Sequence, residues 1–266
     1  MYERFFLRPK IYDEQFLITY LRREDLKTLL NKYIKNDHKD ITVVDFGARS
    51  SPYQGLFSKA CFKFLRADFV SDATPIDVEI SRDGRLDYPS RSVDIVLSLQ
   101  VLEHVDNVDT YLEEAERILK PGGILWLTTH GMWPHHPTPQ DNYRWTLEGL
   151  EKILGSRFNI INTRPIMGSP AYAIMIYLNL MWEATRLLNH YQCVILNQFS
   201  KSKKWGKSGK RKNRINNKYV YVGNIIFILF ASMVNPLMYF VDAITPMSLK
   251  FRESAVFRVY AEKRIR

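Results

Sequence analysis

Cysteine is scarce in this sequence of 266 residues, which contains only Cys61 and Cys193. Two cysteines cannot build a disulfide framework, and their spacing is not that of a zinc site. The first ten residues contain no long apolar stretch followed by a cleavage site of small residues, so no secretory signal is predicted. We therefore expect a cytoplasmic protein that has neither a disulfide scaffold nor a bound metal.

A basic surface spread over the whole chain is also lacking, although the formal net charge is +10. Nine Lys and Arg residues and no acidic residue lie between Ser200 and Tyr219, and the rest of the chain carries a net charge of only +1. A localised run of this kind argues against a groove for nucleic acid. Next to an apolar segment it favours the anionic inner face of a membrane as a partner. The nine residues are Lys201, Lys203, Lys204, Lys207, Lys210, Arg211, Lys212, Arg214 and Lys218.

Apolar, β-branched runs alternate with amphipathic helical patterns over the first part of the chain. This alternation predicts the α/β class, with a doubly wound, mostly parallel sheet. The runs expected to be strands are 41–47, 62–68, 76–80, 93–99, 124–129 and 158–163, and the helical patterns are 13–36, 108–119 and 146–154.

The character of the sequence changes after Pro165. Two uncharged stretches, Pro165–Trp182 and Tyr219–Val241, flank the basic run. The second is long enough to span a bilayer, but polar residues interrupt it. A transmembrane span, an interfacial helix and a buried helical insertion therefore remain open. The predicted parts are an N-terminal helical segment (1–40), a core (41–165), a helical insertion (166–250) with a basic loop (200–219), and a final strand (251–266).

Acidic residues follow several of the predicted strands. The first strand ends at Asp45-Phe-Gly47, and the second ends at Asp68, 23 residues after Asp45. In an open α/β sheet, ligands bind beyond the carboxyl ends of the strands. The spacing is close to that at which an acid accepts hydrogen bonds from both ribose hydroxyls of a nucleoside cofactor. Asp83 follows the third strand, where it could receive an exocyclic amine. Each acid alone could equally be a helix cap or a turn former.

An ordered set of motifs resembles the class I S-adenosylmethionine-dependent methyltransferases, most closely their type 11 subgroup. The resemblance covers residues 41–165 and implies a seven-stranded sheet with S-adenosylmethionine as cofactor. The motifs are Asp45-x-Gly47, Asp68, Asp83-Gly-x-Leu-x-Tyr-Pro, Ser92-Val-Asp-Ile-Val, Gln100-Val-Leu-Glu-His104-Val and Leu119-Lys-Pro-Gly-Gly.

The resemblance also implies roles for single residues. Gly47 would lie under the methionine part of the cofactor, Asp68 would hold the ribose, and Asp83 would hold the adenine amine. Gln100 and Val101 would flank the cofactor after the fourth strand.

One position departs from the family pattern Asp-x-Gly-x-Gly, because Arg49 replaces the second glycine. A side chain there would crowd the cofactor or impose a positive φ, unless the loop follows a different path. An inactive, methyltransferase-like scaffold is therefore an alternative to an active enzyme.

Four of the six histidines, at positions 104, 130, 135 and 136, follow the fourth and fifth strands. Imidazole titrates near neutrality, so His104 and His136 are candidates for the general base that a hydroxyl acceptor needs. A similar stretch occurs in the same methyltransferase subgroup, which implies that the substrate side includes His130, His135, Asp141, Tyr143 and Arg144. An alternative for Asp141 and Arg144 is a structural ion pair.

We predict methyl transfer to an oxygen of a small molecule, a sugar or a lipid-linked glycan. An RNA methyltransferase tethered by the basic loop is an alternative. No Asn/Asp-Pro-Pro-Tyr/Phe motif follows the fourth strand, which disfavours methylation of adenine in nucleic acid. Neither cysteine follows a proline, which disfavours a covalent mechanism on cytosine.

Overall fold

The computed structural model describes residues 6–13, 15–35, 40–57, 62–70, 75–137, 140–202, 209–252 and 254–265. Within these ranges, the side chains of 32–35, 188–202, 209–224, 226 and 251–252 are not described. The chain divides into two compact units. The core unit comprises residues 1–8, 18–169 and 245–266, and the helical unit comprises residues 9–17 and 170–244.

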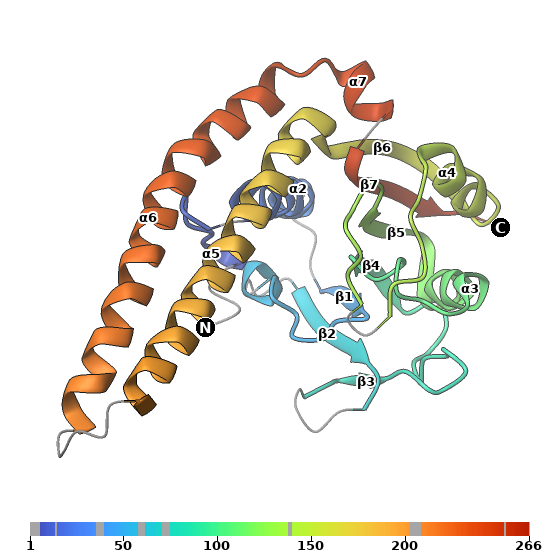
Figure 1. Cartoon of the computed structure of the whole chain (residues 1–266). Helices are drawn as coiled ribbons and strands as arrows, with labels where there is room; N and C mark the ends of the chain where they lie inside the picture. The colour runs from blue at the N-terminus through green and yellow to red at the C-terminus, as the bar shows by residue number, and fades with distance from the viewer. Residues whose placement is uncertain are drawn as a thin grey trace. The chain divides into compact units, whose positions relative to one another are not determined.

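Seven strands within the described residues form one sheet, in the order β3-β2-β1-β4-β5-β7-β6 (Figure 1). The first five strands of this order pair in parallel, and β7 runs antiparallel between β5 and β6. The predicted doubly wound, mostly parallel sheet with a helical insertion before the last strand is confirmed. The strands are β1 (Ile41–Phe46), β2 (Phe62–Asp68), β3 (Val78–Glu79), β4 (Val93–Leu99), β5 (Leu119–His130), β6 (Phe158–Gly168) and β7 (Ser254–Lys263).

The apolar residues of the central strands alternate between the two faces of the sheet. Val44 and Phe46 pack on one face in a cluster with helices α3 (Val108–Ile118) and α4 (Leu147–Gly155). Val43 packs on the other face with α2 (Phe16–Lys35). Helices cover both faces, which explains why these strands are continuous apolar runs.

Capping residues fix the starts of the two helices that cover the first face. Asn107 caps α3 by accepting a hydrogen bond from the backbone N–H of Thr110 at 3.1 Å. Thr146 caps α4 by accepting from the N–H of Gly149 at 3.0 Å. Each cap satisfies a donor that has no partner within the helix. Because α3 follows β4, its capped start fixes the path of the loop 100–107.

Strand β3 is shorter than the predicted run 76–80. The Asp77 carboxylate accepts a hydrogen bond from the guanidinium Nε of Arg66 at 2.9 Å. The backbone N–H of Asp77 donates to the carbonyl of Arg66. Ile80 forms an isolated antiparallel bridge with Leu86. The backbone therefore turns back after Glu79 and the parallel ladder ends there.

The helical unit consists largely of α5 (Ser169–Ser202) and α6 (Gly209–Ile244), and α7 (Met247–Arg252) leads back to the core unit. The predicted basic loop over 200–219 is wrong at both ends, because α5 continues to Ser202 and α6 begins at Gly209. Lys and Arg are good helix formers, so a basic run does not by itself predict a loop. Residues 203–208 lie outside the described residues.

Candidate active site at the carboxyl edge of the sheet

The loop after β1 runs close to the end of β2. Gly47 has a φ of +83°, and its N–H donates to the carbonyl of Ala67 at 2.9 Å. Two residues later, the N–H of Arg49 donates to the carboxylate of Asp68. The second oxygen of that carboxylate accepts from the N–H of Phe69 at 2.8 Å. The loop and the acid at the end of β2 therefore hold each other in place.

Arg49, where the family pattern has glycine, adopts the left-handed conformation with a φ of +47°. The loop thus keeps the backbone that glycine would favour and does not take a different path. An arginine in this conformation costs roughly 1–2 kcal/mol. Its N–H bond to Asp68 offsets part of this cost. Because Arg49 is exposed, its side chain has room outside the packed interior.

Asp45 is buried beneath this loop. Its carboxylate accepts a hydrogen bond from the Ser51 hydroxyl at 2.8 Å, which ties the far end of the loop to β1. Burial raises the pKa of Asp45 to about 7, despite the hydrogen bond from Ser51, which lowers it. The nearby charge of Asp68 raises it further. Asp45 therefore positions the loop from below.

The raised pKa of Asp45 predicts a pH dependence of stability. Between about pH 4 and pH 7 the folded protein holds a proton on Asp45 that the unfolded chain has released, so stability falls as the pH rises through this window. Asp45→Asn removes this titration but keeps an acceptor for Ser51. In urea unfolding from pH 4 to pH 8, we expect the parent to lose about 2–4 kcal/mol relative to Asp45→Asn. Replacement of the exposed Asp87 by Asn is the control. Parallel curves for the parent and Asp45→Asn would contradict the raised pKa.

Gly47 packs closely against the loop after β4. A Cβ on Gly47 would lie 2.5 Å from Cγ1 of Val101, so only glycine allows this close approach. The neighbouring Gln100 has a φ of +61°, and its Nε2 donates to the Thr128 hydroxyl at 3.1 Å. Its Oε1 is buried and has no hydrogen-bond partner within the described structure. Asp68 keeps free lone pairs beside its two backbone donors.

These features fit S-adenosylmethionine. An ammonium group can donate to the orphaned oxygen of Gln100, and ribose hydroxyls can donate to Asp68. Gly47, Gln100 and Val101 come from the loops after β1 and β4, where the strand order reverses. That reversal is the usual ligand position in open α/β sheets.

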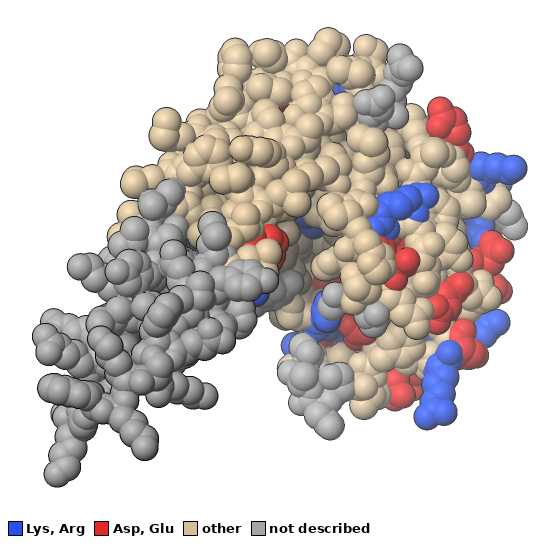
Figure 2. All heavy atoms as spheres, viewed as in Figure 1, with Lys and Arg blue, Asp and Glu red and all other residues tan. Residues whose placement is uncertain are grey.

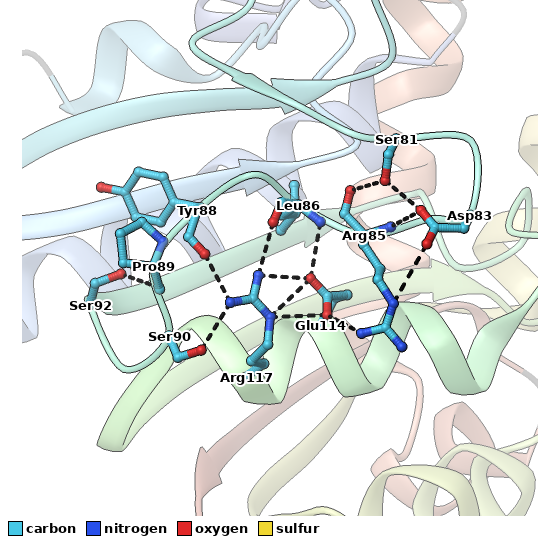
Figure 3. A network of polar contacts seen from close by, with 10 residues as sticks. All are labelled: Ser81, Asp83, Arg85, Leu86, Tyr88, Pro89, Ser90, Ser92, Glu114 and Arg117. Carbon is cyan, nitrogen blue, oxygen red and sulfur yellow. Dashed lines mark hydrogen bonds and ion pairs between the residues drawn. The ribbon is translucent and has the colours of Figure 1, made fainter.

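Asp83 lies at the tip of an exposed turn that follows β3 (Figure 3). Its carboxylate accepts from the Ser81 hydroxyl at 2.5 Å and lies 3.6 Å from the guanidinium of Arg85. A Cβ on the adjacent Gly84 would lie 3.5 Å from Thr110, so the turn is next to the start of α3. This position is at the carboxyl edge of the sheet, and Asp83 stays a predicted contact for the adenine amine.

The same turn is anchored by a buried acid on α3 (Figure 3). Glu114, 1% exposed, accepts from the N–H of Leu86 at 3.0 Å and from the guanidinium of Arg117 at 2.9 Å. Burial acts to raise the pKa of Glu114, but the hydrogen bonds from Arg117 and Leu86 outweigh it and lower the pKa. Arg117 also donates to the carbonyls of Leu86 and Tyr88. The hollow over this segment is lined in part by Arg85, Glu114 and Arg117, whose side chains are already paired with one another, which indicates a structural role.

Glu103 and His130 form a buried pair between β4 and β5. One Glu103 oxygen accepts from the Thr129 hydroxyl at 2.8 Å, and the other lies 3.1 Å from Nδ1 of His130. Burial raises the pKa of Glu103 and lowers the pKa of His130. Both shifts favour the uncharged form of each group. His130, 4% exposed, also stacks on Trp133 with 4.7 Å between ring centroids, so it supports the loop from inside.

The loop after β5 is closed by an ion pair. Arg144 binds Asp141 with both guanidinium nitrogens, at 2.5 and 2.6 Å, and also donates to the carbonyl of Trp133 at 3.0 Å. Asp141 accepts from the N–H of His136 at 2.7 Å, and the hydrogen bonds from Arg144 hold the pKa of Asp141 well below its usual range. The structural interpretation of Asp141 and Arg144 thus has direct support. Their polar atoms are occupied by the loop itself.

Closure of this loop brings His136 to His104, with 5.9 Å between ring centroids. Burial, and secondarily the charge of His104, lowers the pKa of His136, so its imidazole is neutral at pH 7. Nδ1 of His104 contacts the carbonyl of Gln140. A carbonyl oxygen only accepts, so Nδ1 carries the proton and Nε2 is left as an acceptor.

The remaining predicted substrate residues lie at the rim of this loop. His135 is exposed, and the Tyr143 ring stacks on Trp145 at 5.2 Å between centroids. Sequence reasoning missed Ser51 and Gln140, because neither residue type nor spacing signals their contacts. Glu103 was included in a motif without a role of its own. No group of three or more potential metal-ligating side chains is found among the described residues.

Residues 32–127 match the family model described as a methyltransferase domain. The chain contains a class I methyltransferase domain of the type 11 subgroup, and the cofactor of such a domain is S-adenosylmethionine.

Two curated relatives are named ubiquinone biosynthesis O-methyltransferase. The protein from Paramagnetospirillum magneticum is 44% identical over 51 residues, which are 19% of this chain and 20% of the relative. The protein from Pelagibacter ubique is 21% identical over 127 residues, which are 42% of this chain and 51% of the relative. The chain thus spans about half or less of the length of the curated relatives it matches.

Among solved structures, a candidate sarcosine dimethylglycine methyltransferase from Galdieria sulphuraria has the same fold. The alignment has a TM-score of 0.52 at 11% identity and covers 92% of this chain and 86% of that one. At this identity the likeness concerns the fold alone.

Proposed function

We propose that this protein transfers a methyl group from S-adenosylmethionine to an oxygen of a small molecule, a sugar or a lipid-linked glycan. The observation that carries the proposal is the position of His104. This residue follows the Gln100–Val101 segment by three residues, and its Nε2 is free to accept a proton. A base therefore lies next to the place where the reactive part of the cofactor would bind.

The cofactor would be held by groups at the ends of three strands. Asp68 would accept from the ribose hydroxyls, Gln100 from the ammonium group, and the exposed turn at Asp83 from the adenine amine. The absence of a Cβ at Gly47 lets the β1 loop pack directly against Val101. The bound cofactor supplies an activated methyl group on a sulfonium, so alignment with the acceptor provides most of the rate.

The acceptor side would use the two neighbouring histidines. A hydroxyl must lose its proton as it attacks, and His104 Nε2 or the neutral His136 can receive it. The buried Glu103–His130 pair and the Asp141–Arg144 ion pair keep the surrounding loop in shape. The names of the two curated relatives support oxygen as the methylated atom.

The proposal predicts that His104→Gln lowers the rate of methyl transfer by about 10²–10⁴-fold, the usual contribution of a general base. The affinity for S-adenosylmethionine should stay unchanged. The assay uses cofactor labelled on the methyl group with catechol and methyl glycosides as acceptors, followed by mass analysis of the product. His136→Gln is tested in parallel, and Glu148→Gln, at an exposed position of α4, is the control.

Equal rates of methyl transfer in His104→Gln and Glu148→Gln would contradict the assignment of His104 as the base. A labelled product on nitrogen, carbon or RNA would contradict oxygen transfer. Cofactor binding without transfer to any acceptor would favour the inactive scaffold.

A further inference from the structure

The helical unit has an outward face that is more apolar than its inward face. On α6, the residues buried within the unit recur at every third or fourth position and include Asn235 and Asp242. Asp242 is the only charged residue between 225 and 244, and it lies on the buried side. The large apolar residues that are exposed are Ile225, Ile228, Leu229, Met233, Leu237, Tyr239, Phe240 and Ile244. We call these eight residues the α6 apolar face.

The spacing of these residues shows that they form one continuous stripe. Ile225, Leu229, Met233 and Leu237 follow one another at intervals of four, which places them on one side of a helix. Met233 is 76% exposed and Leu229 is 61% exposed, values that are high for side chains of this size. At 1.5 Å per residue the stripe is about 28 Å long. Figure 2 shows tan surface without Lys, Arg, Asp or Glu along the C-terminal half of α6.

The polar side chain of Asn235, on the same helix, forms its hydrogen bonds inside the helical unit. The Asn235 side chain donates to the carbonyls of Ile11 and Asp13, at 2.6 and 3.0 Å. The buried side also holds Phe227, Ala231 and Met238, so α6 is apolar on both sides. A surface helix in water usually exposes polar residues. The apolar outward face of α6 therefore indicates that this face meets an apolar medium.

Helix α5 adds to this surface. Tyr177, Leu180 and Leu187 are each more than half exposed, at spacings of three and seven residues. The two helices contact each other through Trp182 and Phe227, whose ring centroids are 4.4 Å apart. Both helices of the unit therefore carry apolar side chains that the described structure leaves uncovered.

The distribution of charge along the chain indicates which apolar medium the α6 apolar face meets. The nine Lys and Arg residues of 200–219, with no acid among them, come between the exposed parts of α5 and α6 in the chain. An apolar helix face next to a cationic run matches a bilayer with anionic headgroups, because headgroups attract the cations and the acyl boundary accepts the apolar face. The apolar core of an interface with a protein partner would account for the α6 apolar face, but it would not account for a run of Lys and Arg residues without an acidic residue.

Residues Phe227–Ile244 are also long and apolar enough to cross a membrane by length and composition, with a mean hydropathy of 1.7. However, 28% of this window is buried within the structure. The buried side holds Asn235 and Asp242. A helix with one protein-covered side and one apolar side suits the plane of the membrane surface.

We propose that the helical unit docks on an anionic lipid bilayer, with the α6 apolar face in the headgroup–acyl boundary. The nine cationic residues that the sequence carries between Ser200 and Tyr219 supply the attraction to anionic headgroups. This docking stands independently of the acceptor that the core unit methylates. It places the chemistry of the core unit at a membrane surface.

The test is sedimentation of the purified full chain with vesicles. Vesicles of phosphatidylcholine alone are compared with vesicles that also contain phosphatidylglycerol, at low and high salt. The parent should bind the anionic vesicles, and high salt should release it, because screening weakens the attraction of surface charges. Leu229→Gln, Met233→Gln and Leu237→Gln together should lower the partition coefficient by roughly tenfold or more.

Two further variants make the result specific. Replacing Lys203, Lys204, Lys210, Arg211 and Lys212 with Gln should remove the preference for anionic vesicles. Ile161→Gln with Ile265→Gln, at exposed positions of the core unit, should bind as the parent does. Circular dichroism and cofactor titration verify that each variant is folded.

Three outcomes would overturn the proposal. Binding of the triple Gln variant equal to that of the parent would exclude the α6 apolar face. Equal binding to both kinds of vesicle that survives high salt would favour a transmembrane span. Absence of vesicle binding, with a change of oligomeric state in the triple variant, would show that a second copy of the chain covers this face.

Discussion

Gly47→Ala is expected to reduce the affinity for S-adenosylmethionine by at least about tenfold and to destabilise the fold by about 1–2 kcal/mol. The new Cβ would lie 2.5 and 2.9 Å from the two Cγ atoms of Val101, so the β1 loop or the loop after β4 must move. The φ of +83° adds a backbone strain that every residue with a Cβ has in this conformation. Since both loops contribute to the cofactor site, their displacement removes the close approach on which binding depends.

A control separates the backbone cost from the clash. Gly122 has a comparable φ of +75°, and a Cβ there would meet only the flexible end of Glu262 at 3.4 Å. Gly122→Ala should lower stability but leave cofactor affinity unchanged. Val101→Ala in the Gly47→Ala background should recover part of the affinity, because it removes the clashing atoms. Titration of each variant with the cofactor measures the effect, and unchanged affinity in Gly47→Ala would contradict the position of the site.

Glu114→Ala is expected to lower the free energy of unfolding by about 3 kcal/mol, the lower end of the range for breaking a buried ion pair. The lower end applies because Arg117 is 29% exposed and can recover some hydration. The substitution leaves the N–H of Leu86 without its acceptor and frees the turn that carries Asp83. Urea unfolding at pH 7 measures this loss.

The neighbouring Glu113→Ala is the matched control, because Glu113 is exposed on the same helix. The lowered pKa of Glu114 also sets a pH dependence. The stabilisation that Glu114 provides is complete above the pKa that this residue has in the unfolded chain, and it is lost as the pH falls through the lower pKa that it has in the folded protein. The free energies of unfolding of the parent and Glu114→Ala should therefore become equal in acid. Equal stability of Glu114→Ala and Glu113→Ala at pH 7 would show that the network in Figure 3 does not hold the turn.

The sequence predicted the order of strands and helices because apolar periodicity reflects burial directly. Strands β1 and β4 are covered on both faces, and they are the clearest apolar runs in the chain. The basic run was wrongly expected to be a loop throughout, because charge density indicates exposure and not backbone conformation. Strand β3 was overestimated because Asp77 and the Ile80–Leu86 bridge end the ladder, and neither contact is visible in a local pattern.

At the site, sequence reasoning found the residue types but not their contacts. The spacing of Asp45 and Asp68 predicted acids at one edge, whereas the hydrogen bond between Asp45 and Ser51 depends on a positive φ at Arg49 and at Ser51 itself. The histidines were predicted to converge, but only the fold shows that His130 is buried against Glu103. Contacts of this kind depend on tertiary packing, and a single sequence does not record it.

Isothermal titration of the purified full chain with S-adenosylmethionine measures whether the cofactor binds at the carboxyl edge of β1, β2 and β4. We expect saturable binding to one site in the parent, together with thermal protection, and at least about tenfold weaker binding in Gly47→Ala. The contradicting result is an absence of both heat and thermal protection in the parent at millimolar cofactor.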